Sequence, residues 1–308
     1  MVNNQGPTPK DYALLLDANF DTLNKRPPFD ASLLLDKNLD WFLIEYINEM
    51  ELLGLSNEQT LNALLTMIGG LSNNSYCRNL LTGSVVWLNV FSHVLGNTGS
   101  NKSYFASESM HSSKTLDDKY SSVYFNRRFV NDSDDAEEQP KKKQKTGQWS
   151  FSVSTITEAA LSKNSNYTDV MIVNSDGDNA LKLLSYYEQI SSNSTQGVSC
   201  FCNAFDGIES SRNDRHRSSK LSMYVVSTGK KLSIPNMKIV EEGANDGVYW
   251  RVWYTHTGTV RELPDVLLQK QVSLPNFTHI ALCCQYVFQN RIIEFRYGLF
   301  RSGFNYQQ

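Results

Sequence analysis

The chain has 308 residues, of which 40% are hydrophobic, and a formal net charge of -3. This length and composition provide for a sizeable core in one large domain or two small ones. The charge gives no global signature of nucleic-acid binding, so any such surface would be a local patch. The 5 cysteines are odd in number and lack metal-type spacing, which argues against a secreted disulfide framework and favours an intracellular protein. No stretch of eighteen uninterrupted apolar residues occurs, and we expect a soluble protein.

The first 55 residues carry apolar groups at helical spacing around a Pro27-Pro28 break. They predict a helical N-terminal extension over residues 1–55. A capping box at Ser56 to Gln59 then predicts a helix with one apolar face, which Gly69-Gly70 would end. We expect this helix to pack on a sheet that begins near Val85.

The apolar run Val85 to Leu95 predicts a strand, and the octet Gly96-Asn97-Thr98-Gly99-Ser100-Asn101-Lys102-Ser103 follows it directly. A strand that leads into a glycine-containing loop with Lys-Ser at its far end has the layout of a phosphate-binding P-loop, G-x-x-x-x-G-K-[ST]. Asn101 takes the place of the second glycine. The alternative is an ordinary Gly/Asn/Ser turn between a strand and a helix.

The residue types of this octet suit the phosphates of a nucleotide. Successive backbone N–H groups in a tight loop form an anion-binding concavity, and the following helix adds its positive N-terminal end. Lys102 would reach the β- and γ-phosphates, and the Ser103 hydroxyl would bind a magnesium ion. Asn101 keeps the loop feasible because Asn tolerates a left-handed backbone best among the non-glycine residues. The predicted binding residues are Gly96, Gly99, Ser100, Asn101, Lys102 and Ser103.

Residues 112–148 contain few apolar groups after Phe129, and an acidic run is followed by a lysine cluster. Such segregated charge cannot bury a core and predicts an exposed, disordered insertion. The lysine cluster behind Pro140 also has the form of a monopartite nuclear localisation signal, with a solvated charge run as the alternative. The cluster consists of Lys141, Lys142, Lys143 and Lys145.

The apolar run Val170 to Val173 predicts a strand buried on both faces, ending in Asn174-Ser175-Asp176-Gly177-Asp178. An aspartate at the carboxyl end of a buried strand downstream of a P-loop is where a Walker B residue helps to hold magnesium. Asp176 is therefore a predicted metal ligand and catalytic residue, with Ser103 as the other metal ligand. The alternative is a strand-to-helix turn in which Asp178 caps the next helix, and both can hold at once.

These features are followed by Asp206-Gly207, Arg212 and an aromatic strand around Arg251. Taken in order, they resemble an uncharacterised family of RecA-like P-loop domains found beside primase and helicase modules in phage, bacterial and mobile-element proteins. The resemblance covers about residues 55 to 255 apart from the charged insertion. It implies an α/β P-loop domain over residues 56–308, with a mostly parallel sheet and helices on both faces. It also implies ATP and Mg²⁺ as cofactors, bound at the carboxyl ends of the strands.

The resemblance carries one departure that bears on catalysis. The family pattern has a glutamate that polarises the attacking water where this chain has Gly177, so we expect nucleotide binding rather than efficient turnover. Asp178 or Glu158 are the candidate substitutes. The resemblance also implies that Arg251 contacts the γ-phosphate of the same or a neighbouring subunit as a catalytic residue. The alternative for Arg251 is an ion pair with a surface acid at a sheet edge.

The loop after Gly207 is basic, and in a RecA-like domain it would face nucleic acid and contact its phosphates. A solvated loop is the alternative. The residues concerned are Arg212, Arg215, Arg217 and Lys220.

Three functions follow from the sequence. The first is an ATP-binding domain resembling helicase-type ATPases, and the second is a non-catalytic, degenerate P-loop scaffold serving nuclear or DNA-associated assembly. The third is a structural protein whose loop binds no nucleotide.

Overall fold

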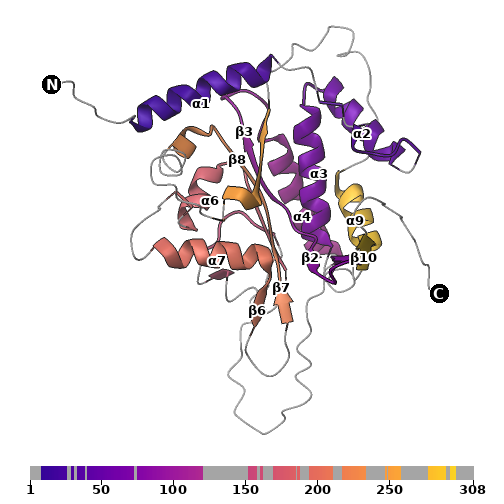
Figure 1. Cartoon of the computed structure of the whole chain (residues 1–308). Helices are drawn as coiled ribbons and strands as arrows, with labels where there is room; N and C mark the ends of the chain where they lie inside the picture. The colour runs from indigo at the N-terminus through magenta and orange to yellow at the C-terminus, as the bar shows by residue number, and fades with distance from the viewer. Residues whose placement is uncertain are drawn as a thin grey trace, which may run out of the picture.

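The fold is α/β, with helices on both faces of a central parallel sheet (Figure 1). This confirms the predicted fold class at that level. The computed structural model describes residues 8–25, 29–30, 33–38, 40–72, 75–120, 152–157, 160–161, 169–184, 186–187, 194–210, 217–233, 247, 249–257, 277–288 and 292–295.

The central sheet has five strands in the order β4-β5-β8-β3-β9, and every pairing between neighbours is parallel. The three inner strands are buried along their whole length, as expected for strands covered on both faces. The strands are β3 (Phe91–Leu95), β4 (Ser152–Val153), β5 (Val170–Asn174), β8 (Leu221–Ser227) and β9 (Val252–His256).

The connections that follow the neighbouring strands β3 and β8 run in opposite directions across this sheet, which makes this the point where the strand order reverses. From β3 the chain passes to β4 at one edge, returns through β5 to β8 beside β3, and then crosses β3 to reach β9 at the other edge. In open α/β sheets, ligands bind outside the carboxyl ends of the strands at the point where the order reverses. The loop that follows β3 therefore lies at the favoured ligand position of this topology.

Helices cover the two faces of the sheet. The helices α3 (Asn57–Leu71), α4 (Tyr104–Tyr120) and α9 (Phe277–Phe288) share one hydrophobic cluster with the sheet, and α2 (Trp41–Leu52) joins it. The helices α6 (Gly177–Leu183) and α7 (Ser194–Asp206) share the other cluster. The side chains of β5 alternate between the two clusters, because successive residues of a strand face opposite sides of its sheet.

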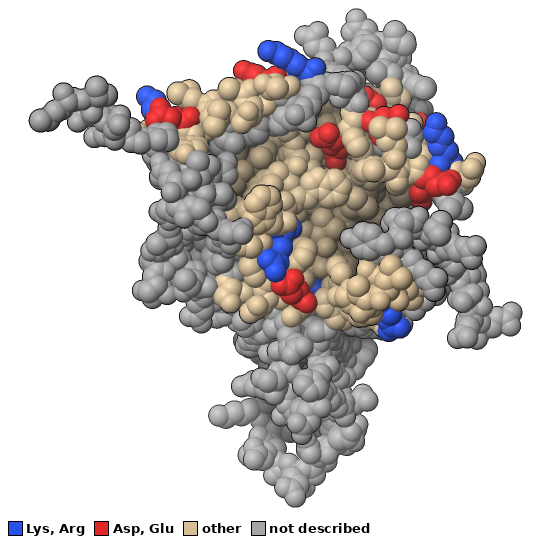
Figure 2. Space-filling view, in the orientation of Figure 1, with Lys and Arg blue, Asp and Glu red and all other residues tan. Residues whose placement is uncertain are grey.

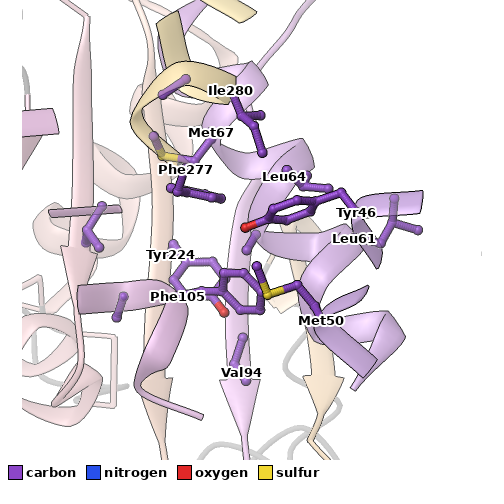
Figure 3. Close-up of a cluster of buried hydrophobic side chains, with 14 of the residues drawn as sticks. Tyr46, Met50, Leu61, Leu64, Met67, Val94, Phe105, Tyr224, Phe277 and Ile280 are labelled. Carbon is purple, nitrogen blue, oxygen red and sulfur yellow. The ribbon is translucent and has the colours of Figure 1, made fainter. Parts of the chain in front are cut away.

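Figure 3 shows the first cluster from within. Val94 and Tyr224 come from the sheet, Leu64 and Met67 from α3, and Phe277 from α9. Tyr46 and Met50 of α2 point into the same cluster, so the core includes part of the predicted 1–55 extension. The helix α1 (Pro9–Asn24) contacts the short 3₁₀ helix η2 (Lys230–Leu232), which follows the carboxyl end of β8.

The helix α3 begins as predicted and ends later than predicted. The Ser56 side chain accepts a hydrogen bond from the Gln59 amide at 3.2 Å, which caps the first turn. Gly69 and Gly70 lie inside the helix, where they allow close packing. A Cβ atom at Gly70 would lie 2.5 Å from the Met171 Sδ atom.

The predicted strand Val85 to Leu95 forms two strands in different sheets. The first, β2 (Val85–Trp87), pairs with β1 (Tyr76–Asn79), which also pairs with β10 (Ile292–Phe295). The second, β3, belongs to the central sheet. Between them the buried Asn89 donates hydrogen bonds to the carbonyls of Phe205 at 2.8 Å and Leu221 at 2.9 Å. These bonds fix the chain where it leaves one sheet for the other.

The helix α4 extends into the segment 112–148 that was expected to be disordered, so the expectation is wrong for residues 112–120. Ser112 and Ser113 are buried, and the Thr278 hydroxyl of α9 donates to the Ser112 hydroxyl at 3.1 Å. Small serine side chains let the two helices approach closely. Residues 121–148, with the acidic run and the lysine cluster, lie outside the described residues. Among the helices that the structure describes, none is long and apolar enough to cross a membrane.

Candidate functional site

The octet Gly96 to Ser103 connects β3 to α4 at the carboxyl edge of the central sheet. Both neighbouring strands hold the point at which β3 passes into the octet. The Gly96 amide donates to the Ser227 carbonyl at the end of β8 at 3.2 Å, and the Thr257 amide after β9 donates to the Leu95 carbonyl at 2.9 Å. The loop therefore starts from a position that three strands define.

Gly96 is packed too tightly for any side chain. A Cβ atom there would lie 2.1 Å from the Thr257 Oγ1 atom and 2.6 Å from the Ser100 Oγ atom. These two hydroxyls join each other, since Thr257 Oγ1 donates to Ser100 Oγ at 2.9 Å. The first glycine of the octet thus lets the loop fold back over the end of β9. The sequence of the octet shows Gly96 and Ser100, but it could not show that Thr257 packs against them, because Thr257 lies far away in the chain.

The loop contains two left-handed residues. Gly99 has a φ angle of 86° and Asn101 has a φ angle of 52°, the only positive φ among the described non-glycine residues. The sequence prediction that Asn101 replaces a glycine by tolerating a left-handed backbone is therefore confirmed. Both residues are exposed to solvent.

Lys102 reaches back across the loop. Its Nζ atom donates to the Asn97 carbonyl at 2.8 Å, and its own carbonyl accepts a hydrogen bond from Gln59 Nε2 of α3 at 2.9 Å. Partial burial lowers the pKa of the Lys102 ammonium group below its ordinary value. Ser103 is half-buried directly before α4, and its carbonyl accepts the Ser107 amide at 3.1 Å. The 17-residue helix α4 therefore has its positive N-terminal end at the loop.

Asp176 lies at the same edge of the sheet, directly after β5. The strand β8 separates β5 from β3, so the two chain segments are about 10 Å apart across the sheet. The exposed Asp176 carboxylate accepts a hydrogen bond from Asn179 Nδ2 at 2.6 Å. In the described part of the chain, no hydrogen bond or ion pair joins it to Lys102 or Ser103.

A magnesium ion held by Ser103 and Asp176 stays a prediction. Mg²⁺ keeps several of its waters and is bound by one or two carboxylates together with substrate phosphates. No group of three or more His, Cys, Asp or Glu residues that could hold a metal ion by itself is found among the described residues.

Gly177 has a structural reason to be a glycine. A Cβ atom there would lie 2.8 Å from the Val225 Cβ atom and 2.9 Å from the Val226 amide nitrogen of β8. Strand β8 therefore fills the space that a side chain at position 177 would need, which is where the family that the sequence resembles has glutamate. Asp178 does not replace that glutamate, because it accepts a hydrogen bond from the Tyr187 hydroxyl at 2.7 Å and lies 3.9 Å from Lys231 Nζ. Glu158 lies outside the described residues.

The structure does not bring Arg251 to the octet of its own chain. Arg251 precedes the amino end of β9, whereas the octet follows the carboxyl end of β3, and the two strands are parallel. The Arg251 guanidinium lies 2.7 Å from the Asp206 carboxylate, and Nη1 donates to the Gly247 carbonyl at 2.9 Å. This is the ion pair that the sequence analysis gave as the alternative. A contact with a nucleotide in a neighbouring subunit stays a prediction.

The expectation that Lys220 contacts nucleic acid is wrong. Its side chain is buried, and Nζ donates to the Ser72 carbonyl at 2.8 Å, the Ser72 hydroxyl at 2.9 Å and the Leu88 carbonyl at 2.9 Å. Burial lowers the pKa of Lys220 to about 8. Lys220 precedes β8 and so lies at the edge of the sheet opposite the octet.

The rest of the predicted basic loop is described only in part. Arg217 begins strand β7 (Arg217–Ser219), which pairs with β6 (Ile208–Ser210). Arg212 and Arg215 lie outside the described residues. On the face shown in Figure 2, the coloured Lys and Arg side chains are scattered among acidic ones and gather into no single positive patch. A nucleic-acid surface therefore stays a prediction for Arg212, Arg215 and Arg217.

Sequence reasoning missed a buried pair beneath the octet. His93 of β3 is fully buried, and its Nε2 atom forms a hydrogen bond at 2.8 Å with the Ser227 hydroxyl of β8. Burial lowers the pKa of His93 to about 3, so the ring is neutral at physiological pH. A lone histidine in an apolar run gave no signal of this partner, since only the strand order places Ser227 beside it.

Comparison with family models, curated proteins and solved structures finds no match for this chain.

Proposed function

We propose that the chain is a RecA-like P-loop domain that binds ATP through the octet Gly96 to Ser103. The observation that carries the proposal is the octet itself. It joins β3 to a long helix at the reversal point of a parallel sheet, with left-handed Gly99 and Asn101 and with Lys102 folded over its mouth. Loop amides, a helix N-terminus and a lysine at such a position are the parts of a phosphate cradle.

Each residue of the octet has a defined task in this proposal. Gly96 lets the backbone turn over β9, and the left-handed residues Gly99 and Asn101 curve the loop. The Ser100 amide donates to the Asn97 carbonyl at 3.2 Å, and the remaining loop amides would bind the phosphates. The Lys102 ammonium exchanges its contact with the Asn97 carbonyl for the β- and γ-phosphate oxygens. The Ser103 hydroxyl and Asp176 would hold Mg²⁺, which neutralises charge on the phosphates when it is bound.

The packing of Gly177 favours slow turnover or none. A water-positioning carboxylate is worth several kcal/mol of barrier in phosphoryl transfer, commonly about 10²-fold to 10⁴-fold in rate. The backbone at Gly177 has no space for such a side chain, and Asp178 is engaged by Tyr187. The second candidate function is therefore a binding module that holds ATP without consuming it, in the manner of a degenerate P-loop scaffold.

Titration calorimetry with ATP, in the presence and absence of Mg²⁺, tests the proposal. The wild-type chain should bind ATP more tightly with Mg²⁺, and Lys102→Ala should abolish the binding. Lys114→Ala is the matched control, because Lys114 is an exposed lysine of the helix that follows the octet. A wild-type chain that binds no ATP, or a Lys102→Ala variant that binds as the wild type does, would refute the proposal. A phosphate-release assay on the same protein separates the two candidate functions.

A further inference from the structure

A second lysine lies on the strand end that adjoins the octet. The carbonyl of Ser227, the last residue of β8, accepts the Gly96 amide at 3.2 Å, and Lys230 follows three residues later. Three residues span at most about 11 Å of extended chain, and here they form a tight turn. The backbone of Lys230 therefore lies beside the octet at the same edge of the sheet.

The turn that carries Lys230 is held at four points. Gly229 has a φ angle of 78°, and its amide donates to the Ser227 hydroxyl at 3.0 Å. The amide of the buried Leu232 donates to the Gly229 carbonyl at 2.9 Å, and the Ser233 hydroxyl donates to the Lys230 carbonyl at 2.8 Å. His93 fixes the Ser227 hydroxyl from below at 2.8 Å. The lysine backbone is thus positioned by the same strand ends that position the octet.

The two lysines of this turn differ in their surroundings. Lys231 Nζ lies 3.9 Å from the Asp178 carboxylate and 5.9 Å from the centre of the Tyr187 ring. Lys230 is exposed, and within the described ranges it pairs with no acidic side chain.

The charge of a nucleoside triphosphate exceeds what one lysine and one Mg²⁺ ion together neutralise. Lys102 is the only lysine or arginine of the octet, and Arg251 lies at the opposite edge of the sheet in an ion pair with Asp206. We propose that Lys230 binds the γ-phosphate of the nucleoside triphosphate held by the octet, an inference that rests on the proposed function. The site would then distinguish a triphosphate from a diphosphate without an arginine from another subunit.

Calorimetry with Mg²⁺ and two nucleotides tests this inference: AMPPNP, a triphosphate analogue that is not hydrolysed, and ADP. The test variant is Lys230→Gln, which removes the charge from an exposed side chain. Lys231→Gln is the matched control on the same turn. Loss of one charge-assisted hydrogen bond predicts that Lys230→Gln weakens AMPPNP binding about tenfold or more, with ADP binding changed less than about twofold. Lys231→Gln should leave both affinities within about twofold of the wild type.

The outcomes separate the two proposals. If Lys230→Gln binds AMPPNP as tightly as the wild type, or loses ADP and AMPPNP equally, Lys230 does not contact the γ-phosphate, while ATP binding by the octet stands. If Lys231→Gln loses as much affinity for AMPPNP as Lys230→Gln does, the effect comes from the overall positive charge of the turn. This result would also overturn the inference. A wild-type chain that binds neither nucleotide would refute the proposed function itself, and the role of Lys230 with it.

Discussion

Replacement of Gly96 by alanine would add a Cβ atom that clashes with two neighbouring side chains. The added Cβ atom would lie 2.1 Å from Thr257 Oγ1 and 2.6 Å from Ser100 Oγ, whereas real Cβ contacts are almost never shorter than 3.0 Å. Both side chains have to move, and the 2.9 Å hydrogen bond between them is lost. The loop then no longer lies over the end of β9 in its present form.

The cost follows from these contacts. Overpacking of a filled site costs about 1–3 kcal/mol, and the buried hydrogen bond contributes about 1 kcal/mol. The free energy of unfolding should therefore fall by about 2–4 kcal/mol in Gly96→Ala. At about 2–4 °C per kcal/mol for domains of 150–250 residues, we expect the Tm to fall by roughly 4–16 °C.

Thermal unfolding of the two single variants and the double variant measures this coupling. Thr257→Ala removes the Oγ1 atom, so that Gly96→Ala should cost at least about 1 kcal/mol less in that background. Gly99→Ala is the control, because Gly99 has a φ angle of 86° and open space around its Cα atom. Its cost of about 1–2 kcal/mol comes from backbone strain and should not depend on Thr257. Strictly additive effects of Gly96→Ala and Thr257→Ala would refute this account of the loop.

Three further predictions concern residues around the octet. The unfolded chain binds more protons than the folded one between the folded pKa of His93, about 3, and its ordinary 6.5, so the unfolding free energy should fall as the pH drops through this window. Urea titrations should show this acid loss reduced in His93→Gln, and an unchanged slope would contradict it. The folded pKa of Lys220 is about 8 against an ordinary 10.5, so the unfolding free energy should rise with pH through this window. Urea titrations at pH 8 and 10 should show this rise in the wild type, and the Lys220 contribution to it should be absent in Lys220→Met. Arg251→Ala should bind ATP within about twofold of the wild type in calorimetry, and a tenfold loss would place Arg251 at a nucleotide after all.

Much of the local structure was predictable because it depends on neighbouring residues. The Ser56 cap, the buried run of β5 and the left-handed Asn101 all follow from short-range rules on capping, hydrophobic patterning and backbone sterics. The octet was found for the same reason. Its layout of strand, turn and helix is contained in one continuous segment.

The remaining features depend on how distant segments pair. Parallel strand order places Ser227 and Thr257 against the octet and moves Arg251 to the far edge, and no local pattern encodes that order. Lys220 looked like part of an exposed basic loop, yet the carbonyls of Ser72 and Leu88 enclose its ammonium group. Its burial could not be inferred from neighbouring residues, because its partners lie more than a hundred residues away in the chain.

The central claim is that the octet itself holds the nucleotide, and amide hydrogen exchange with mass spectrometry tests it most directly. On addition of Mg²⁺ and ATP, peptides that cover Gly96 to Ser107 should exchange more slowly, because the phosphates bind the loop amides and the first turn of α4. Peptides from β7, which pairs with β6 and precedes the amino end of β8, should exchange as before. Binding that leaves the exchange of the octet unchanged, or that protects only β7, would contradict the account.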